Sequence, residues 1–175
     1  MNFRMPVRLI MPLFLLLSSS AFTQTTREEK KKAGQEQRAA ERAQLKANID
    51  ARQYSFFAQT ATALDGKLFQ LSSLYFLKIH QDSLDADLPY YGRAYAATLG
   101  NTNGGIRFKS TSFSYGVKDL KKGGWFITIV PENNRNANKM ELSIDQDGYA
   151  SLEVSSTYRE SISFRGEIRP NSNRP

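Results

Sequence analysis

The chain has 175 residues, a formal net charge of +7, one histidine and no cysteine. Without cysteine it can form no disulfide and no Cys-His catalytic pair, and it lacks the cysteine that carries the lipid of a bacterial lipoprotein. Beyond residue 23, the larger part of the basic surplus precedes Tyr54, whereas a nucleic-acid binder concentrates basic residues on its folded face. We therefore expect no nucleic-acid partner.

Residues 1–23 have the three-part layout of a secretory signal peptide. Arg4 and Arg8 precede an apolar run from Leu9 to Leu17, and small and polar residues follow from Ser18 to Thr23. The apolar run is about half of the ~20 residues needed to span a bilayer, so a permanent membrane anchor is not expected. The pattern predicts a soluble periplasmic protein that is not a lipoprotein.

Cleavage after Thr23, or alternatively after Ala21, would leave a charged arm over residues 24–53. Glu, Lys, Arg, Gln and Ala dominate this arm, which contains no proline, so its intrinsic preference is helical. Its alanines share one face, while Leu45 and Ile49 point nearly the opposite way, so the helix has little apolar surface to bury. We expect a solvated helical linker; a basic helix resting on anionic lipid is the less favoured alternative.

From residue 54 to 175 the pattern changes to short stretches in which apolar and polar residues alternate. Such alternation is typical of half-buried strands. The clearest stretches are Tyr75–Ile79, Ile106–Phe108, Trp125–Val130, Met140–Asp145, Ala150–Ser155 and Ile162–Ile168.

Tight-turn signals separate these stretches at Lys122-Gly123-Gly124 and Asp147-Gly148, which favours antiparallel neighbours. We expect seven to nine strands and no helix between them long enough for a parallel crossover. The prediction is one all-β domain: a small antiparallel meandering barrel or a strongly curved sheet, in preference to a sandwich.

Residues that could carry catalysis are scarce. The single histidine, His80, closes a strand on its polar side, and no serine lies in a Gly-x-Ser-x-Gly elbow. We therefore predict no catalytic residue, no cofactor and no enzymatic activity.

Two acidic groups could supply oxygen ligands to calcium. The first is Asp82, Asp85 and Asp87, beside which nothing completes a coordination shell. The second, Asp145 to Gly148, imitates an EF-hand loop but has Val154 where the bidentate glutamate belongs. We interpret the first as a polar loop and the second as a hairpin turn, and we predict no metal site.

The segment Leu88–Tyr95 concentrates unusual residues and supplies the candidate binding residues Tyr90, Tyr91, Arg93 and Tyr95. A proline and a glycine favour a bend between strands, and the tyrosines combine large apolar faces with hydroxyl tips. The segment could form the rim of a pocket, with Arg93 contacting an anionic ligand. Alternatively, it is an aromatic plug that closes one end of the barrel.

The chain resembles a family of small exported Bacteroidetes proteins known as domain of unknown function 4251. The resemblance covers Tyr54 to Pro170 and rests on five segments: Leu74–Leu77 leading into Asp82-Ser83, Leu88–Tyr95, Gly104–Phe108, Gly148–Ser156 and Arg159–Gly166. It implies an all-β fold of lipocalin-like topology. It implies no activity and no catalytic residues, because none is established for the family.

Together these observations predict a periplasmic, non-catalytic, monomeric β-barrel that binds a small or lipidic molecule or an envelope component. A barrel of about eight strands is either filled by its own side chains or able to hold one small ligand. Filling by Trp125, Phe108 and Phe164 would leave only surface recognition. The alternative is a protein-interaction module of the envelope whose arm, Arg27 to Arg52, extends its reach; a hydrolase is the least favoured reading.

Overall fold

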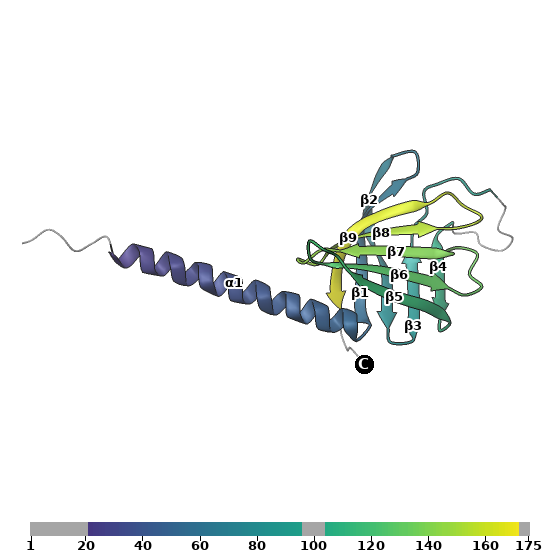
Figure 1. Cartoon of the computed structure of the whole chain (residues 1–175). Helices are drawn as coiled ribbons and strands as arrows, with labels where there is room; N and C mark the ends of the chain where they lie inside the picture. Colours follow the sequence, from purple (N-terminus) through teal and green to yellow (C-terminus); the bar gives the residue numbers. More distant parts are fainter. Residues whose placement is uncertain (1–20, 96–103, 172–175) are drawn as a thin grey trace, which may run out of the picture. The chain divides into compact units, whose positions relative to one another are not determined.

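The computed structural model describes residues 21–95 and 104–171, so residues 1–20 of the expected signal peptide lie outside the described part. Within the described residues, every regular element after helix α1 (Ala21–Asp50) is a strand. The strands are β1 (Gln53–Ala63), β2 (Leu68–His80), β3 (Ser83–Leu88), β4 (Ile106–Ser110), β5 (Phe113–Asp119), β6 (Trp125–Pro131), β7 (Lys139–Ile144), β8 (Tyr149–Ser155) and β9 (Ile162–Pro170) (Figure 1). None of the helical residues described here forms a stretch long and apolar enough to cross a membrane.

The chain divides into two compact units, residues 1–37 and residues 38–175. The first contributes the leading part of α1, whose residues 27–37 are all exposed. The second contains the last turns of α1, from Arg38 to Asp50, together with every strand.

All nine strands belong to one antiparallel sheet with the order β4-β3-β2-β1-β9-β8-β7-β6-β5. Two consecutive-strand meanders, β1–β4 and β5–β9, are therefore joined through the pairing of β1 with β9. The two edge strands, β4 and β5, are consecutive in the chain and only two residues separate them, so the two ends of the sheet meet at that corner. The sheet is nearly closed, which confirms the predicted antiparallel meandering barrel.

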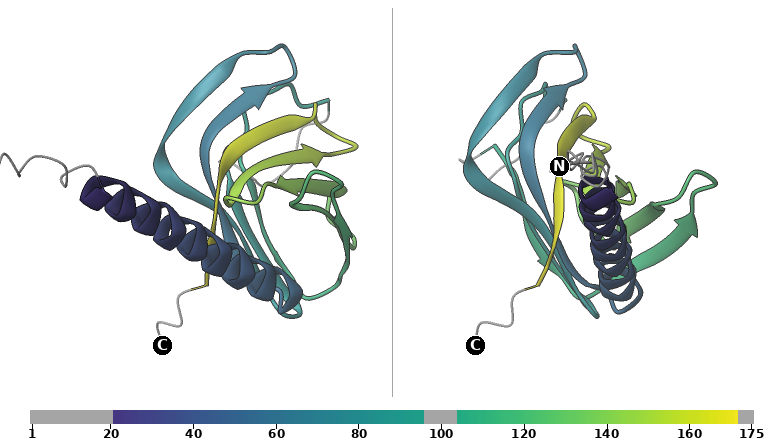
Figure 2. Two further views of the ribbon diagram at one scale, coloured as in Figure 1. Left: turned by 60° about the vertical axis from the view of Figure 1, so that its left-hand side comes forward. Right: turned by 90° about the vertical axis from the view of Figure 1, so that its left-hand side faces the viewer.

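The two meanders run in different directions, and the long strands bend to join them. In Figure 1 strands β1–β4 run nearly vertically and β5–β8 run across them, while Figure 2 shows the sheet wrapped around a common interior. A register shift between Ala58 and Thr60 interrupts the pairing of β1 with both neighbours. Gly166 lies opposite this bulge, where an added Cβ would be 1.8 Å from the Phe57 carbonyl oxygen, so the strands approach this closely because residue 166 has no side chain.

The predicted alternation coincides with the inward faces of the strands. The inward side chains form one continuous apolar core, with Tyr54, Phe56 and Phe164 among its largest fully buried members. Trp125 is also buried and Phe108 packs against the core. The described part of the interior is thus occupied by the protein's own side chains.

The end of α1 joins this core through two side chains. Ile49 is fully buried and Leu45 packs against the core, whereas the alanines of the opposite face stay exposed. The two residues are four positions apart and therefore share one face of the helix. The amount of apolar surface on the helix is small, as expected, but it is placed where two large side chains can reach the barrel.

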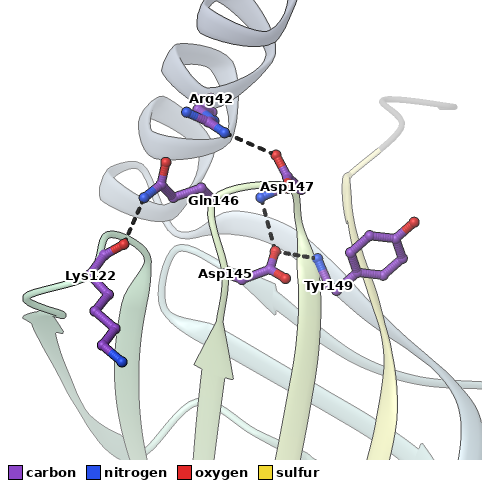
Figure 3. A network of polar contacts seen from close by, with 6 residues as sticks. All are labelled: Arg42, Lys122, Asp145, Gln146, Asp147 and Tyr149. Atoms are coloured by element: carbon purple, nitrogen blue, oxygen red, sulfur yellow. Dashed lines mark hydrogen bonds and ion pairs between the residues drawn. The ribbon is translucent and has the colours of Figure 1, made fainter.

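The turn between β7 and β8 is stabilised by the carboxylate of Asp145, as Figure 3 shows. Oδ1 of Asp145 accepts hydrogen bonds from the backbone N–H groups of Asp147, at 2.9 Å, and Tyr149, at 3.0 Å. Gly148 has a φ of 88°, which glycine adopts without steric cost. These residues form a hairpin turn between β7 and β8, as predicted.

Side chains of the same turn contact two neighbouring segments (Figure 3). Nη2 of Arg42 on α1 is 3.2 Å from Oδ1 of Asp147, and Nε2 of Gln146 donates to the Lys122 carbonyl at 2.8 Å. Both members of the ion pair are solvent-exposed, so the ion pair contributes at most about 1 kcal/mol. The burial of Ile49 is the stronger attachment of the helix.

Two tyrosines meet inside the barrel. The hydroxyls of Tyr54 on β1 and Tyr115 on β5 are hydrogen-bonded at 2.9 Å, and the Arg52 guanidinium lies 4.7 Å from the centre of the Tyr115 ring. Burial raises the pKa of both phenols, that of Tyr54 well above its ordinary value. Both groups are therefore neutral at physiological pH.

Candidate functional site

A concavity of about 480 Å³ lies between the tip of the β1–β2 hairpin and the segment that follows β3. We call it the hairpin hollow. Its lining is Ala63, Leu64, Asp65, Lys67, Phe69, Tyr91, Gly92, Arg93 and Glu160. The hollow thus combines residues from three separate parts of the chain.

Hydrogen bonds fix the turn at the tip of the β1–β2 hairpin, and this turn leaves one apolar side chain exposed to solvent. The Ala63 N–H donates to the Lys67 carbonyl at 3.0 Å, and Oδ1 of Asp65 accepts from the Lys67 N–H at 3.0 Å. Gly66, with a φ of 85°, completes the turn. As a result Leu64 projects from the tip with 64% of its surface exposed.

One wall of the hollow is an aromatic stack. The rings of Phe69 and Tyr91 are nearly parallel, with their centres 4.2 Å apart, and Lys67 Nζ lies 5.3 Å from the centre of the Phe69 ring. Such stacking holds the two rings in a fixed arrangement and adds about 0.5–1.5 kcal/mol beyond their burial. The wall is therefore an ordered apolar surface with a cation at its edge.

Tyr90 fastens the bend that carries Tyr91 and Arg93. Its hydroxyl lies 2.9 Å from the Arg93 carbonyl oxygen and 3.1 Å from that of Glu160. Gly92 makes room for this hydroxyl, because a Cβ there would be 2.6 Å from it. Burial and the neighbouring Glu160 carboxylate raise the pKa of Tyr90, so the phenol stays protonated and can donate.

A short ladder ties the same bend to the connection between β8 and β9. The Glu160 N–H donates to the Arg93 carbonyl at 3.1 Å, and the Arg93 N–H donates to Oε2 of Glu160 at 3.2 Å. The Tyr95 N–H donates to the Tyr158 carbonyl at 2.8 Å. The Glu160 carboxylate is therefore hydrogen-bonded to the backbone of the bend.

Two cations of the hollow lack a carboxylate partner. Among the described residues, neither Lys67 nor Arg93 has a carboxylate within ion-pair distance. The Arg93 side chain is exposed. Both positive charges are available to an anionic group that enters the hollow.

The four binding residues proposed from the sequence have different positions in the structure. Tyr91 and Arg93 line the hollow, Tyr90 holds the bend, and Tyr95 has 69% of its surface exposed and does not line the hollow. The segment thus contributes both to the rim of a concavity and to closing the bend.

Leu64, Lys67, Phe69 and Glu160 line the hollow but were not predicted as binding residues from the sequence. The Asp65-Gly66 pair is a hairpin signal that could have located Lys67 at a turn. No local signal places Phe69 against Tyr91, or Glu160 against Arg93, since these pairs are far apart in the chain.

The other polar candidates have structural roles. His80 is exposed at the end of β2, as expected. The expected polar loop at Asp82 to Asp87 is wrong for two of its three residues, because Asp85 and Asp87 lie on strand β3. They form ion pairs with Lys109, at 3.0 Å, and Arg107, at 2.7 Å, across the β3–β4 pair. Within residues 21–95 and 104–171, no three His, Cys, Asp or Glu side chains are grouped so that they could hold a metal ion.

A second concavity, of about 610 Å³, lies beside the last turns of α1. Leu45, Ile168 and Pro170 supply apolar surface, and Arg42, already paired with Asp147, is among its polar residues. One of its cations is therefore already ion-paired, whereas among the described residues Lys67 and Arg93 form no ion pair with Asp65 or Glu160, the two carboxylates that line the hairpin hollow with them.

Comparisons with known proteins agree with the fold. A family model described as "Domain of unknown function (DUF4251)" matches residues 36–168, a range that begins close to the start of the compact unit at Arg38. The crystal structure of a DUF4251 family protein from Bacteroides eggerthii is similar, with a TM-score of 0.52, 15% identity, and coverage of 71% of this chain and 83% of that chain. No curated protein matches the chain.

Proposed function

Because the chain belongs to the DUF4251 family, a domain of unknown function, we propose its function from the hairpin hollow itself. The protein is an exported, non-catalytic binding protein that holds an anionic amphiphile there. By this we mean a molecule with an apolar chain and a carboxylate or phosphate head, free or within a larger envelope component. The three-part pattern of residues 1–23 supports export.

One observation carries the proposal: an exposed leucine, an ordered aromatic wall and two cations without carboxylate partners face the same concavity. Leu64 and the Phe69–Tyr91 stack offer apolar surface to a chain. Lys67 and Arg93 offer charge-assisted hydrogen bonds to an anionic head. No part of this arrangement supplies a nucleophile or a general base with a partner to activate it.

The filled core favours the hollow over the barrel interior as the binding site. Phe56 and Phe164 are fully buried inside the sheet, and Ile49 joins the same core. A ligand in this part of the interior would have to displace side chains that are already packed, at a cost of several kcal/mol.

The proposal is tested by titrating the protein with decyl phosphate and with decanol, followed by native mass spectrometry and by NMR shifts of the backbone amides. We expect saturable binding of decyl phosphate, with shifts at Lys67, Tyr91 and Arg93, and much weaker binding of the uncharged decanol. Replacing both Lys67 and Arg93 with alanine removes two charged contacts that are worth up to about 1 kcal/mol each, because both side chains are exposed, and should weaken binding by about tenfold.

Leu64→Ser should also weaken decyl phosphate binding, by a few fold, since it removes apolar contact. The matched control is Leu74→Ser, because Leu74 on β2 is as exposed as Leu64 but does not line the hollow. The proposal is wrong if wild-type protein does not bind decyl phosphate, or if Leu74→Ser weakens binding as much as Leu64→Ser.

A second candidate function is protein interaction through the edge of the sheet. Among the strands that the structure describes, β5 pairs only with β6, and Val117 on it is 44% exposed. An unpaired edge with an exposed apolar residue can accept an extended segment of another protein as an additional strand.

A further inference from the structure

We infer that Arg159 is the positioning residue of the hairpin hollow: it fixes the bend that presents Tyr91 and Arg93 without lining the hollow itself. The effect on ligand binding rests on the proposed function. The structural part of the inference, that Arg159 orders the bend, does not.

Arg159 is a buried cation whose charge is met without a carboxylate. Only 5% of its surface is exposed, and no described carboxylate lies within ion-pair distance of it. Residues 96–103 of the sequence contain no Asp or Glu either. Burying a charge is costly unless polar partners compensate it, so the contacts that Arg159 does make are the reason for its position.

Those contacts join segments that are distant in the chain. Nη1 of Arg159 donates to the carbonyl oxygens of Gly104, at 3.0 Å, and Gly105, at 3.3 Å. Its guanidinium carbon lies 5.0 Å from the centre of the Tyr90 ring. The backbone of Arg159 also forms a β-bridge with Ala94. One residue therefore connects the start of β4, the bend after β3 and the connection between β8 and β9.

The contact between Arg159 and Tyr90 links Arg159 to the residues that line the hollow. The guanidinium covers the Tyr90 ring, while the hydroxyl of that ring reaches the Arg93 and Glu160 carbonyls. Tyr90 is followed directly by Tyr91, which stacks on Phe69. Loss of the guanidinium should free the Tyr90 ring and, through it, the backbone between Tyr91 and Arg93.

Lysine cannot reproduce these contacts. A planar guanidinium can cover an aromatic ring and donate to carbonyls in its plane at the same time, whereas an ammonium is a compact, strongly hydrated point charge. Arg159→Lys keeps the charge, so the backbone between Tyr91 and Arg93 should keep part of its order. Arg159→Met keeps much of the side-chain length but removes the charge and the donors, so this order should be lost.

The structural part is tested by hydrogen exchange of single amides, measured by NMR in the absence of ligand. In Arg159→Met we expect exchange at the Tyr95 and Glu160 amides to be at least about tenfold faster, since their acceptors lie in the ladder beside Arg159. Arg159→Lys should give an intermediate rate. The Tyr149 amide, bonded to Asp145 in a distant turn, is the internal control and should be unchanged.

If Arg159→Met does not fold, Arg159→Lys and Tyr90→Phe carry the test, because both keep the ring and a long side chain at position 159. Tyr90→Phe removes only the hydroxyl and should speed exchange at the Glu160 amide while leaving that of Tyr149 unchanged. Exchange at Tyr95 and Glu160 that matches wild type in the folded variants would overturn the positioning role.

The binding part is tested with decyl phosphate. If wild type binds it, Arg159→Met should bind at least fivefold more weakly, and Arg159→Lys should fall between the two. Equal affinity of wild type and a folded Arg159→Met would overturn the role in binding. If wild type itself does not bind, the proposed function fails, while faster exchange in the variant would still support Arg159 as the residue that orders the bend.

Discussion

At the level of single residues, the fold is constrained most by polar groups that are withdrawn from solvent and have a specific partner. The hydroxyl of the fully buried Tyr54 and that of the half-buried Tyr115 satisfy each other, and the buried guanidinium of Arg159 is met by carbonyl groups and an aromatic ring. A buried donor left without its partner costs about 1–3 kcal/mol. These pairs therefore constrain the fold more than the exposed ion pairs do.

The tyrosine pair predicts how stability depends on alkaline pH. A tyrosine in the unfolded chain ionises near pH 10, and both pKa values are raised in the folded protein. The unfolded state therefore releases these protons first. The stabilisation from the neutral pair is fully present below about pH 10 and is lost as pH rises through the folded pKa values.

We expect the free energy of unfolding, measured by urea denaturation, to fall as the pH rises above about 10, the ordinary pKa of tyrosine. The double variant Tyr54→Phe/Tyr115→Phe should show a shallower fall, since each removed group contributes up to about 1.4 kcal/mol per pH unit. Tyr149→Phe is the control, because Tyr149 is exposed and its removal should leave the slope unchanged. An unaltered slope in the double variant would contradict the assignment.

At the scale of elements, the strands follow from local pattern, and the helix shows what local pattern leaves open. Trp125–Pro131 and Lys139–Ile144 bury every second residue, as their alternation predicts. For α1, the composition predicted a helix. The sequence did not show which face would be buried, because the alanines lie on one face while Leu45 and Ile49 lie nearly opposite. The contact is decided by side-chain size, since a leucine and an isoleucine bury far more apolar area than alanines.

This packing predicts that Ile49→Ala destabilises the barrel although Ile49 belongs to the helix. Removing a fully buried isoleucine should cost about 2–4 kcal/mol in the free energy of unfolding measured by urea denaturation. Ala47→Ser, at an exposed position of the same helix, should change it by less than about 0.5 kcal/mol. Equal stability of Ile49→Ala and wild type would show that the helix end is not part of the cooperative unit.

At the scale of the whole molecule, the nearly closed sheet leaves β4 and β5 as its edges. Edge strands pair with other chains unless they are short, charged or covered. Strand β5 carries Lys118 and Asp119 at its end, whereas Tyr115, Gly116 and Val117 present no charge. This edge is where the second candidate function would act.

We expect Val117→Lys to abolish chemical crosslinking of the protein to envelope partners in cell extracts if the edge is used. Val130→Lys is the matched control, because Val130 is similarly exposed but lies on β6, which is paired on both sides. Deletion of residues 24–37 tests the arm separately; a deletion up to residue 53 would also remove the buried Ile49. Crosslinks that survive Val117→Lys would exclude the edge.

The sequence alone was enough to predict the antiparallel meandering barrel, its hairpin turns and the helical arm, because alternation, turn residues and helix propensity act over a few neighbouring residues. Tertiary structure decided which helix face is buried, where β1 bulges opposite Gly166, and how Phe69, Glu160 and Arg159 come together with the Tyr90–Arg93 bend. Those contacts join residues distant in the chain, and they form only because closing the sheet brings its loops to one place. The family was recognisable from sequence, whereas the candidate binding site is a product of that closure.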